Sequence, residues 1–319
     1  MGKRSSNLTE AISPSPQHCG VVAVVGAPNA GKSTLVNALV GSKVSIVSPK
    51  VQTTRMRVIG IAMTDLPDGG RAQVVLVDTP GIFRVAKRRL ERAMVAAAWQ
   101  GAEDADVVGL MVDAERGIGQ ETRAIVERLK ESGAPRYLIL NKIDLVPRET
   151  LLALTADLNA LLPFEHTFMV SALKQDGIAD VLAACAARLP AGPFLYPEDQ
   201  AADLPLRLLA AEVTREQVFL QLHQELPYEA AVETEKWEER KDGSVRIEQI
   251  IHVQRDGQRA IFLGKGGARI KQIGARARHE LGRMLERPVH LFLHVKVSER
   301  WAEDPSHYRS IGLDYDPKP

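Results

Sequence analysis

The chain has 319 residues, of which 45 % are hydrophobic and 25 % are charged, and its formal net charge is +1. This composition is ordinary for a folded globular protein, and the length predicts two domains. The near-zero charge excludes a globally basic nucleic-acid-binding protein, so any surface for nucleic acid must be local. Two cysteines are too few for a disulfide framework or a zinc cluster, which fits a reducing compartment.

Residues 1–19 are rich in Ser and Pro and are expected to form a disordered tail. This segment lacks the apolar core of a secretory signal. No apolar run in the chain approaches the roughly 18 residues that are needed to span a bilayer. These observations predict a cytoplasmic protein.

Strand-like apolar runs alternate with helical patterns over residues 20–190, which predicts an α/β domain with a mostly parallel six-stranded sheet. The expected strands cover 21–25, 57–63, 73–77, 107–112, 137–140 and 167–170. The expected helices cover 32–40, 88–99, 119–132, 149–161 and 177–188. Pro67-Asp68-Gly69-Gly70 is typical of a hairpin turn, so one antiparallel strand pair is expected within this sheet.

The first expected strand leads directly into the run Gly26–Ser33, which has the spacing G-x-x-x-x-G-K-S. A strand, a glycine loop and a helix in this order are the context of a phosphate-binding loop. Its backbone N–H groups and the helix N-terminus attract anions. In this motif Lys32 reaches the β- and γ-phosphates, and the Ser33 hydroxyl binds Mg²⁺. The residues expected to contact the nucleotide here are Gly26, Asn29, Ala30, Gly31, Lys32, Ser33 and Thr34.

Two further polar segments are expected to complete the phosphate and metal site. Asp78-Thr79-Pro80-Gly81 ends the third strand, where such enzymes hold Mg²⁺ through an aspartate, and the backbone N–H of Gly81 can approach a γ-phosphate. The polar loop 48–55 follows the first helix, and a threonine there can bind Mg²⁺ and sense the γ-phosphate. Thr54 is favoured over Thr53. The expected metal ligands are Ser33, Thr54 and Asp78, and the expected catalytic residues are Lys32, Thr54 and Gly81.

Asn141-Lys142-Ile143-Asp144 follows the fifth expected strand. The Asp144 carboxylate can accept hydrogen bonds from both N1–H and the exocyclic amine of guanine, a donor pair that adenine lacks. Asn141 and the aliphatic stem of Lys142 are expected to support the loop and to cover the base. Ser171-Ala172-Leu173 follows the sixth strand and is expected to bring its backbone close to the guanine oxygen.

These motifs, in this order and spacing, resemble the small GTPase domain. The runs 28–37 and Gln52-Thr53-Thr54-Arg55 resemble the TrmE–Era–EngA group. The resemblance implies GTP and GDP with Mg²⁺ as ligands, and GTP hydrolysis as the activity. Where Ras-like enzymes carry a water-orienting glutamine after D-x-x-G, this chain has Ile82, and a hydrophobic residue is usual there in the group. Hydrolysis is therefore expected to be slow, or to depend on the backbone, on another loop residue such as Gln52, or on a partner.

Residues 191–204 have the composition of a linker, and a second domain is expected over 205–300. A helix is expected around 206–224, strands over 230–239, 245–254 and 289–297, and a helical pair around Gly264. Residues 301–319 are expected to form a C-terminal tail to which no role is assigned.

The second strong motif is the G-x-x-G loop of Gly264-Lys265-Gly266-Gly267, whose lack of Cβ atoms lets a single-stranded nucleic-acid backbone approach closely. Ile270 and Ile273 would line an apolar floor for unstacked bases. Between Arg255 and Arg287 there are nine Lys and Arg residues and three acidic residues, an excess of six positive charges. The expected RNA-binding residues are Gly264, Lys265, Gly266, Gly267, Arg269, Ile270, Lys271 and Ile273.

This second half resembles a type II KH domain, and one GTPase domain followed by a KH domain resembles the Era family of ribosome-assembly GTPases. The resemblance implies a monomeric switch that captures the 3′ end of small-subunit ribosomal RNA, assists in making the small ribosomal subunit and associates peripherally with the membrane. Two other hypotheses stay open at this point. One is a constitutive RNA-binding module with a structural guanine nucleotide, and the other is a P-loop kinase or ATPase.

Overall fold

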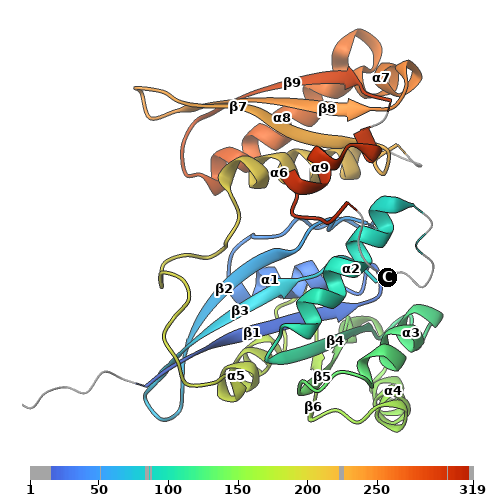
Figure 1. Cartoon of the computed structure of the whole chain (residues 1–319), viewed down its shortest axis with the longest axis vertical. Coiled ribbons are helices and arrows are strands. Elements are labelled where there is room, and N and C mark those ends of the chain that lie inside the picture. Colours follow the sequence, from blue (N-terminus) through green and yellow to red (C-terminus); the bar gives the residue numbers. More distant parts are fainter. Residues whose placement is uncertain are drawn as a thin grey trace, which may run out of the picture.

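The computed structural model describes residues 16–50, 52–82, 86, 88–222, 226–299 and 301–315. The expected tail residues 1–15 and 316–319, and the expected end of a helix at 223–224, lie outside this described part. Within it, an N-terminal domain and a C-terminal domain stack on one another along the long axis of the molecule (Figure 1).

The N-terminal domain is an α/β domain, as predicted. Its elements are β1 (Gln17–Gly26), α1 (Lys32–Val40), β2 (Val58–Asp65), β3 (Arg71–Asp78), α2 (Arg89–Glu103), β4 (Val107–Asp113), α3 (Gln120–Leu129), β5 (Arg136–Asn141), α4 (Arg148–Leu161), β6 (His166–Val170) and α5 (Ile178–Arg188). The sheet has the order β2-β3-β1-β4-β5-β6, in which β2 runs antiparallel to β3 and the other neighbours are parallel. The predicted hairpin is therefore confirmed.

Helices cover both faces of this sheet, which explains its continuous apolar strands. Leu35 of α1 and Cys185 of α5 belong to the core on one face. Ala98 of α2, Ile125 of α3 and Leu154 of α4 belong to the core on the other. The parallel strands end together at one edge of the sheet, which is where α/β proteins place their ligands.

Strand β1 begins at Gln17, so the expected disordered tail is wrong for its last three residues. Gln17, His18 and Cys19 pair in parallel register with the start of β3, and the Cys19 N–H also donates to the carbonyl of Pro190 at 3.1 Å. Backbone pairing of this kind does not require apolar side chains, which is why the polar sequence concealed it.

The expected linker, residues 191–204, lies along the sheet and pairs with its edge strand. Ala202 forms a bridge with Gly60 of β2. The buried Gln73 of β3 accepts hydrogen bonds at its Oε1 from the N–H groups of Leu195 and Tyr196, at 2.9 and 3.0 Å. These contacts cover an otherwise open edge of the sheet and fix the path to the second domain.

The C-terminal domain is an α+β domain, as predicted for a KH fold. Its elements are α6 (Leu206–Gln221), β7 (Ala231–Glu239), β8 (Val245–Val253), α7 (Asp256–Leu263), α8 (Ala268–Met284), β9 (Val289–Val297) and α9 (Pro305–Ser310). The sheet has the order β7-β8-β9, with β7 antiparallel and β9 parallel to β8. Val218 of α6, Phe262 of α7 and Ile273 of α8 form its core together with Ile251 of β8.

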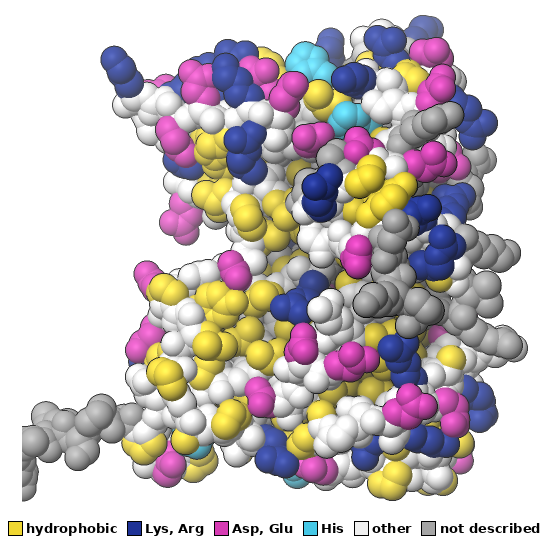
Figure 2. All heavy atoms as spheres, viewed as in Figure 1, with side chains coloured by type: hydrophobic (Ala, Val, Ile, Leu, Met, Phe, Trp, Pro, Cys, Tyr) yellow, Lys and Arg dark blue, Asp and Glu magenta, His cyan; other side chains and the backbone are white. Residues whose placement is uncertain are grey.

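The C-terminal segment was expected to be a tail, and this expectation is wrong for its described residues. Trp301 and Tyr308 are buried in one cluster with Met94 of α2 in the other domain. The indole Nε1 of Trp301 donates to the carbonyl of Glu229 at 3.1 Å. The described residues 301–315 therefore join the two domains, and Figure 1 shows α9 where the domains meet. Figure 2 shows that the domains part on one side, where hydrophobic side chains line the recess.

Replacing Trp301 tests whether this segment is part of the folded structure. Trp301→Ala is expected to lower the free energy of unfolding by about 3–5 kcal/mol, because it leaves a cavity between the domains. Trp301→Phe keeps most of the apolar contact and should cost about 1 kcal/mol, mainly through the lost hydrogen bond. Urea unfolding followed by circular dichroism measures both. If both variants had the same free energy of unfolding as the unchanged protein, the segment would not contribute to the stability of the fold.

Candidate functional site

A cavity of about 470 Å³ opens at the edge of the sheet where the parallel strands end. Its walls come from the loop before α1, the loop between α1 and β2 (residues 41–57, the α1–β2 loop), and the turns after β3, β4, β5 and β6. Such a volume suits a nucleotide-sized ligand. The predicted residues that line the cavity are Asn29, Gly31, Lys32, Ser33, Thr34, Thr54, Gly81, Asn141, Lys142, Asp144, Ser171 and Leu173.

Three other predicted residues lie behind the cavity wall and connect its loops. The carbonyl of Ala30 accepts a hydrogen bond from Asn141 Nδ2 at 2.8 Å, and the Ala172 N–H donates to Asn141 Oδ1 at 3.0 Å. The Gly26 carbonyl accepts a hydrogen bond from Lys32 Nζ at 3.1 Å. Asn141 therefore ties the glycine loop to the loop after β6, which is the supporting role expected of it.

The glycine loop approaches its neighbours so closely that larger residues would not fit. A Cβ atom on Gly31 would lie 2.3 Å from Asn141 Nδ2, and its φ of 103° is in the left-handed region. A Cβ on Gly26 would lie 2.4 Å from the carbonyl oxygen of Met111. With this backbone, α1 begins at Lys32 and directs its free N–H groups toward the cavity.

The fully buried carboxylate of Asp78 gathers hydroxyl groups from two segments. Its Oδ2 accepts hydrogen bonds from Ser33 Oγ at 2.7 Å, Ser45 Oγ at 2.6 Å and Thr54 Oγ1 at 3.4 Å. Ser33 Oγ and Thr54 Oγ1 are themselves 2.8 Å apart. Burial raises the pKa of the Asp78 carboxyl, and the three hydroxyls and nearby Lys32 oppose that rise.

This cluster fits a small, hard cation. Asp78 Oδ1 is buried and has no hydrogen-bond partner among the described residues, so one carboxylate oxygen is available. Carboxylate and hydroxyl oxygens are ligands of the kind that Mg²⁺ prefers. Thr54 faces this cluster, whereas Thr53 Oγ1 bonds to Ser48 and to the carbonyl of Lys50. The preference for Thr54 over Thr53 therefore agrees with the geometry.

Lys32 is a buried cation held by carbonyl groups. Its Nζ donates to the carbonyls of Gly26 and Ala27 at 3.1 and 3.0 Å, and the residue is 6 % exposed. Burial lowers the pKa of Lys32 to about 8, and the charge of Asp78 offsets only part of this effect. An anion entering the cavity would stabilise the charged ammonium group.

Two acidic side chains shape the far end of the cavity. The pKa of Asp144 is lowered, first by a hydrogen bond from Ser171 and further by Lys174, whose Nζ lies 3.2 Å from the carboxylate. Asp144 is therefore present as an acceptor. The buried carboxylate of Asp113 lies 2.5 Å from Lys142 Nζ and so fixes the stem of Lys142 along the cavity wall.

Neither residue considered for positioning water is free to do so in this conformation. Ile82 is buried in the same core cluster as Ala98 of α2 and does not line the cavity. Gln52 lines the cavity, but its Nε2 donates to Glu91 of α2 at 3.0 Å. Gly81 lines the cavity, as predicted. A Cβ atom at this position would lie only 3.0 Å from Pro28 Cα, so a larger residue would crowd the glycine loop.

Sequence reasoning missed three polar residues of this site. Ser45 precedes the polar loop by three residues, and no local pattern marks it as a partner of Asp78. Asp113 ends β4 just as Asp78 ends β3, and this shared position could have identified it. Arg116 also lines the cavity, with its Nε 3.6 Å from Asp113.

A second hollow, of about 390 Å³, lies between α8 and the open edge of β9. The G-x-x-G loop at its end has positive φ angles, and a Cβ on Gly264 would lie 2.8 Å from the Cβ of Arg269. The predicted phosphate-binding side chains at positions 265, 269 and 271 are exposed. The residues lining the hollow are Ile270, Lys271, Gly274, Ala275, Arg278, Leu291, Phe292 and Leu293.

The floor of this hollow, called the RNA groove below, differs from the prediction at one position. Ile270 lines it, but Ile273 is fully buried in the domain core and cannot contact a base. Positions 273, 277 and 281 form the buried stripe of α8, which faces the sheet. Phe292, which the sequence reasoning missed, is 44 % exposed, lines the groove and carries the Arg246 guanidinium 4.8 Å from its ring centre. An exposed aromatic ring of this kind can stack on a base.

Comparison with known proteins gives a consistent result for both domains. A family model described as "50S ribosome-binding GTPase" matches residues 21–142, and a KH domain model matches residues 225–302. The curated GTPase Era of Rhizobium meliloti (strain 1021) is 59 % identical over 300 residues, which cover 94 % of each chain. GTPase Era of Mesorhizobium japonicum is 60 % identical over 298 residues, covering 93 % of this chain and 94 % of the relative.

Among the solved structures that resemble this chain, two match more than nine-tenths of it. An Era variant from Aquifex aeolicus bound to GDP and AlF4⁻ has a TM-score of 0.87 and 39 % identity, covering 92 % of this chain and 99 % of that one. Era in complex with MgGDPNP and nucleotides 1506–1542 of 16S ribosomal RNA has a TM-score of 0.86 and 39 % identity, covering 93 % and 99 %.

The pKa of Lys32 predicts how GDP affinity depends on pH. The anionic ligand favours the charged lysine, so above pH 8 binding must take up a proton, and the affinity falls as the pH rises. Between pH 7.5 and 9 the fall should be about tenfold. Calorimetry in buffers of different ionisation enthalpy measures both the affinity and the proton uptake.

Lys32→Arg serves as the control because arginine stays charged throughout this range. Its affinity should be lower overall and should not change with pH between 7.5 and 9. Parallel pH dependence in the two proteins would assign the titration to another group.

Proposed function

This chain belongs to the Era family of GTPases, and from that membership we propose that it is a switch whose nucleotide state controls its capture of single-stranded RNA. The proposed target is the 3′ end of small-subunit ribosomal RNA, and the proposed process is biogenesis of the small ribosomal subunit. One observation carries the proposal: Thr54 contacts Ser33 and Asp78 at the proposed Mg²⁺ site, while its neighbour Arg55 is buried against the KH domain.

The residues of the cavity divide the work of GTP binding and hydrolysis among them. Lys32 and the N–H groups of the glycine loop hold the phosphates, and Gly81 lets its backbone approach the γ-phosphate. Ser33, Thr54 and Asp78 would hold Mg²⁺, which when bound neutralises phosphate charge. Precise positioning and charge stabilisation supply most of the catalysis in such a site.

The base is read at the opposite end of the cavity. Asp144 accepts the N1–H and the exocyclic amine of guanine, and its lowered pKa keeps it ionised for this purpose. The Lys142 stem, fixed by Asp113, covers the base, and Asn141 holds the surrounding loops together. Because Ile82 is buried in the core, no side chain at that position orients water, and the intrinsic rate of hydrolysis is slow.

Arg55 supplies the link from the nucleotide to the KH domain. Its guanidinium donates to the carbonyls of Ala230 and Tyr228 at 2.8 and 2.9 Å and lies 5.9 Å from the centre of the Trp301 ring. Burial lowers the pKa of Arg55 to about 9, helped by the charge of Arg215. A buried cation held by carbonyls is costly to displace, so a change in the α1–β2 loop on hydrolysis would disturb the docked domain.

The groove beside α8 is the proposed RNA site. The G-x-x-G loop lies against the sugar–phosphate backbone, and exposed Lys265, Arg269 and Lys271 meet phosphates. Ile270 and Phe292 contact the bases. A ribosomal RNA segment is bound in the related structure, which supports RNA as the ligand class.

Cytoplasmic location, peripheral membrane association and a monomeric state remain predictions that rest on the sequence and its resemblance to the family. In the described part of the chain, no helix has both the length and the hydrophobicity to cross a membrane. Sedimentation and cell fractionation of the full chain measure these properties directly.

Removing the Asp144 carboxylate tests the assignment of the base. Asp144→Ala is expected to weaken GTP binding by about 10–100-fold, the value of a charge-assisted hydrogen-bond pair. ATP affinity should be nearly unchanged, because adenine does not use this acceptor. Asp157→Ala, an exposed carboxylate on α4, is the matched control. Equal losses for GTP and ATP in calorimetry with Mg²⁺ would contradict base reading by Asp144.

The proposed switch is tested by measuring RNA affinity in two nucleotide states. An oligonucleotide of the small-subunit rRNA 3′ end should bind more tightly with a non-hydrolysable GTP analogue than with GDP, by about tenfold or more. Lys271→Glu should weaken binding in both states, whereas Lys241→Glu, at the β7–β8 turn, should not. Equal affinity in the two states would favour a constitutive RNA-binding module.

A further inference from the structure

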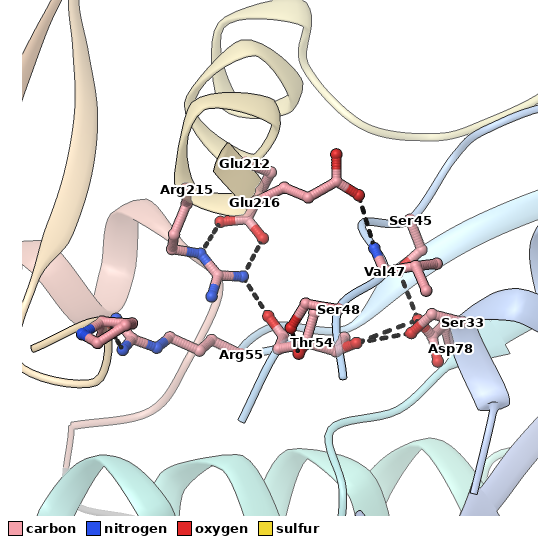
Figure 3. Close-up of polar contacts among 12 residues, drawn as sticks. Ser33, Ser45, Val47, Ser48, Thr54, Arg55, Asp78, Glu212, Arg215 and Glu216 are labelled. Carbon is pink, nitrogen blue, oxygen red and sulfur yellow. Dashed lines mark hydrogen bonds and ion pairs between the residues drawn. The ribbon is translucent and has the colours of Figure 1, made fainter. Parts of the chain in front are cut away.

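The α1–β2 loop is attached to Asp78 near both of its ends and to the KH domain between them. Ser45 and Thr54 both donate to Asp78, and Val47 and Ser48, which lie between them in the chain, are seen below helix α6 (Figure 3). A loop held at two polar points still needs partners for its remaining backbone groups. Side chains from α6 provide several of these partners.

Glu216 holds the first half of the loop. One carboxylate oxygen, Oε1, accepts the Val47 N–H at 2.8 Å, and the other, Oε2, lies 2.6 Å from Lys43 Nζ. The Glu216 side chain is only 6 % exposed, so water screens these contacts weakly. Glu216 therefore fixes the backbone two residues after Ser45.

Arg215 holds the second half of the loop. Its Nη2 donates to the carbonyl of Thr53, the peptide group that directly precedes Thr54. Glu212, one turn earlier on α6, accepts Arg215 Nε at 2.8 Å and so orients the guanidinium toward the loop. Figure 3 shows Arg215 and Glu216 projecting from α6 toward the two halves of the loop.

The same network reaches the helix that lines the RNA groove. Lys43 Nζ lies 3.0 Å from Glu280 on α8, in addition to its pair with Glu216. Glu280 also pairs with Arg283, one turn further along α8, at 2.9 Å. A displacement of α8 would therefore change the partners of Lys43 and the hold of Glu216 on the loop.

We propose that Arg215 and Glu216 are positioning residues of the GTPase site, supplied by the KH domain. They hold the α1–β2 loop in the conformation in which Thr54 faces Ser33 and Asp78. The RNA-binding domain thereby completes the nucleotide site even without RNA. The inference rests on the role proposed for Thr54, and it goes beyond the switch because it concerns the intrinsic, RNA-free reaction.

The test compares full-length variants in the absence of RNA. Glu216→Ala removes both contacts, whereas Glu216→Gln keeps an acceptor for the Val47 N–H and loses the ion pair with Lys43. Arg215→Gln removes the contact with Thr53. Arg207→Gln is the matched control, because Arg207 lies on the same helix but donates to carbonyls at positions 234 and 235 of its own domain.

Two readouts are needed. Amide hydrogen exchange of the α1–β2 loop, with GDP bound, reports the hold on the loop independently of catalysis. Exchange should speed up by about tenfold in Arg215→Gln, which loses one contact, by at least about tenfold in Glu216→Ala, which loses two, and by less in Glu216→Gln. Single-turnover GTP hydrolysis should slow by about tenfold in the same order, with the Mg²⁺ concentration for half-maximal rate raised and GDP affinity unchanged.

Lys43→Gln gives a second route if an α6 variant fails to fold. It removes the same ion pair from the GTPase side, together with the pair to Glu280. It should therefore loosen the loop at least as much as Glu216→Gln, and the double variant should add little to Lys43→Gln alone. Unchanged loop exchange and hydrolysis in Arg215→Gln and Glu216→Ala, or changes no larger than those of Arg207→Gln, would overturn the proposal. Equal RNA affinity in the two nucleotide states would instead contradict the switch and leave this inference standing.

Discussion

The buried carboxylate of Asp78 is the constraint on which the rest of the structure depends. Its Oδ2 accepts hydrogen bonds from the hydroxyls of Ser33, Ser45 and Thr54. These bonds join the glycine loop, the α1–β2 loop and the end of β3 at one point. The other oxygen is buried without a hydrogen-bond partner in the described part of the chain. A buried, unpaired carboxylate oxygen favours a bound cation. Loss or movement of that cation would change the contacts of Asp78 with the glycine loop and with the α1–β2 loop together.

The two domains are joined by contacts of two physical kinds. Trp301 and Tyr308 bury apolar surface against α2, and this attraction does not depend on exact geometry. Arg55, on the α1–β2 loop, instead buries its charge against the KH domain, and Arg215 and Glu216 bury theirs against that loop. In such contacts attraction repays desolvation only while distances and angles are kept. The apolar contact can hold the domains together while the polar contacts respond to the loop. This division suits a protein whose domains stay joined while a conformational change in one alters the contacts of the other.

The architecture and the nucleotide motifs could be predicted from the sequence because each depends on neighbouring residues. A strand, the run Gly26–Ser33 and a helix follow one another directly, so their spacing alone indicates a phosphate-binding loop. The RNA groove was less predictable, because Ile270 and Ile273 are both apolar and lie one turn apart on α8. Only the packing of that helix decides that Ile270 lines the groove and Ile273 lies in the core. Phe292 was missed because it lies on β9, whereas the expected RNA-binding residues lie in the G-x-x-G loop and α8. Only the packing of β9 beside α8 brings Phe292 to the groove.

By itself, the sequence determined the two-domain organisation, the guanine-nucleotide motifs and the G-x-x-G loop, since the chemistry of each lies in a short run of residues. The tertiary structure alone decided that Ser45 completes the Asp78 cluster and that the C-terminal segment packs between the domains. It also brought Glu216 to Val47, a pair 169 residues apart in the chain. Contacts of this kind leave no local pattern, because they arise only when separate elements pack and their buried polar groups must find partners.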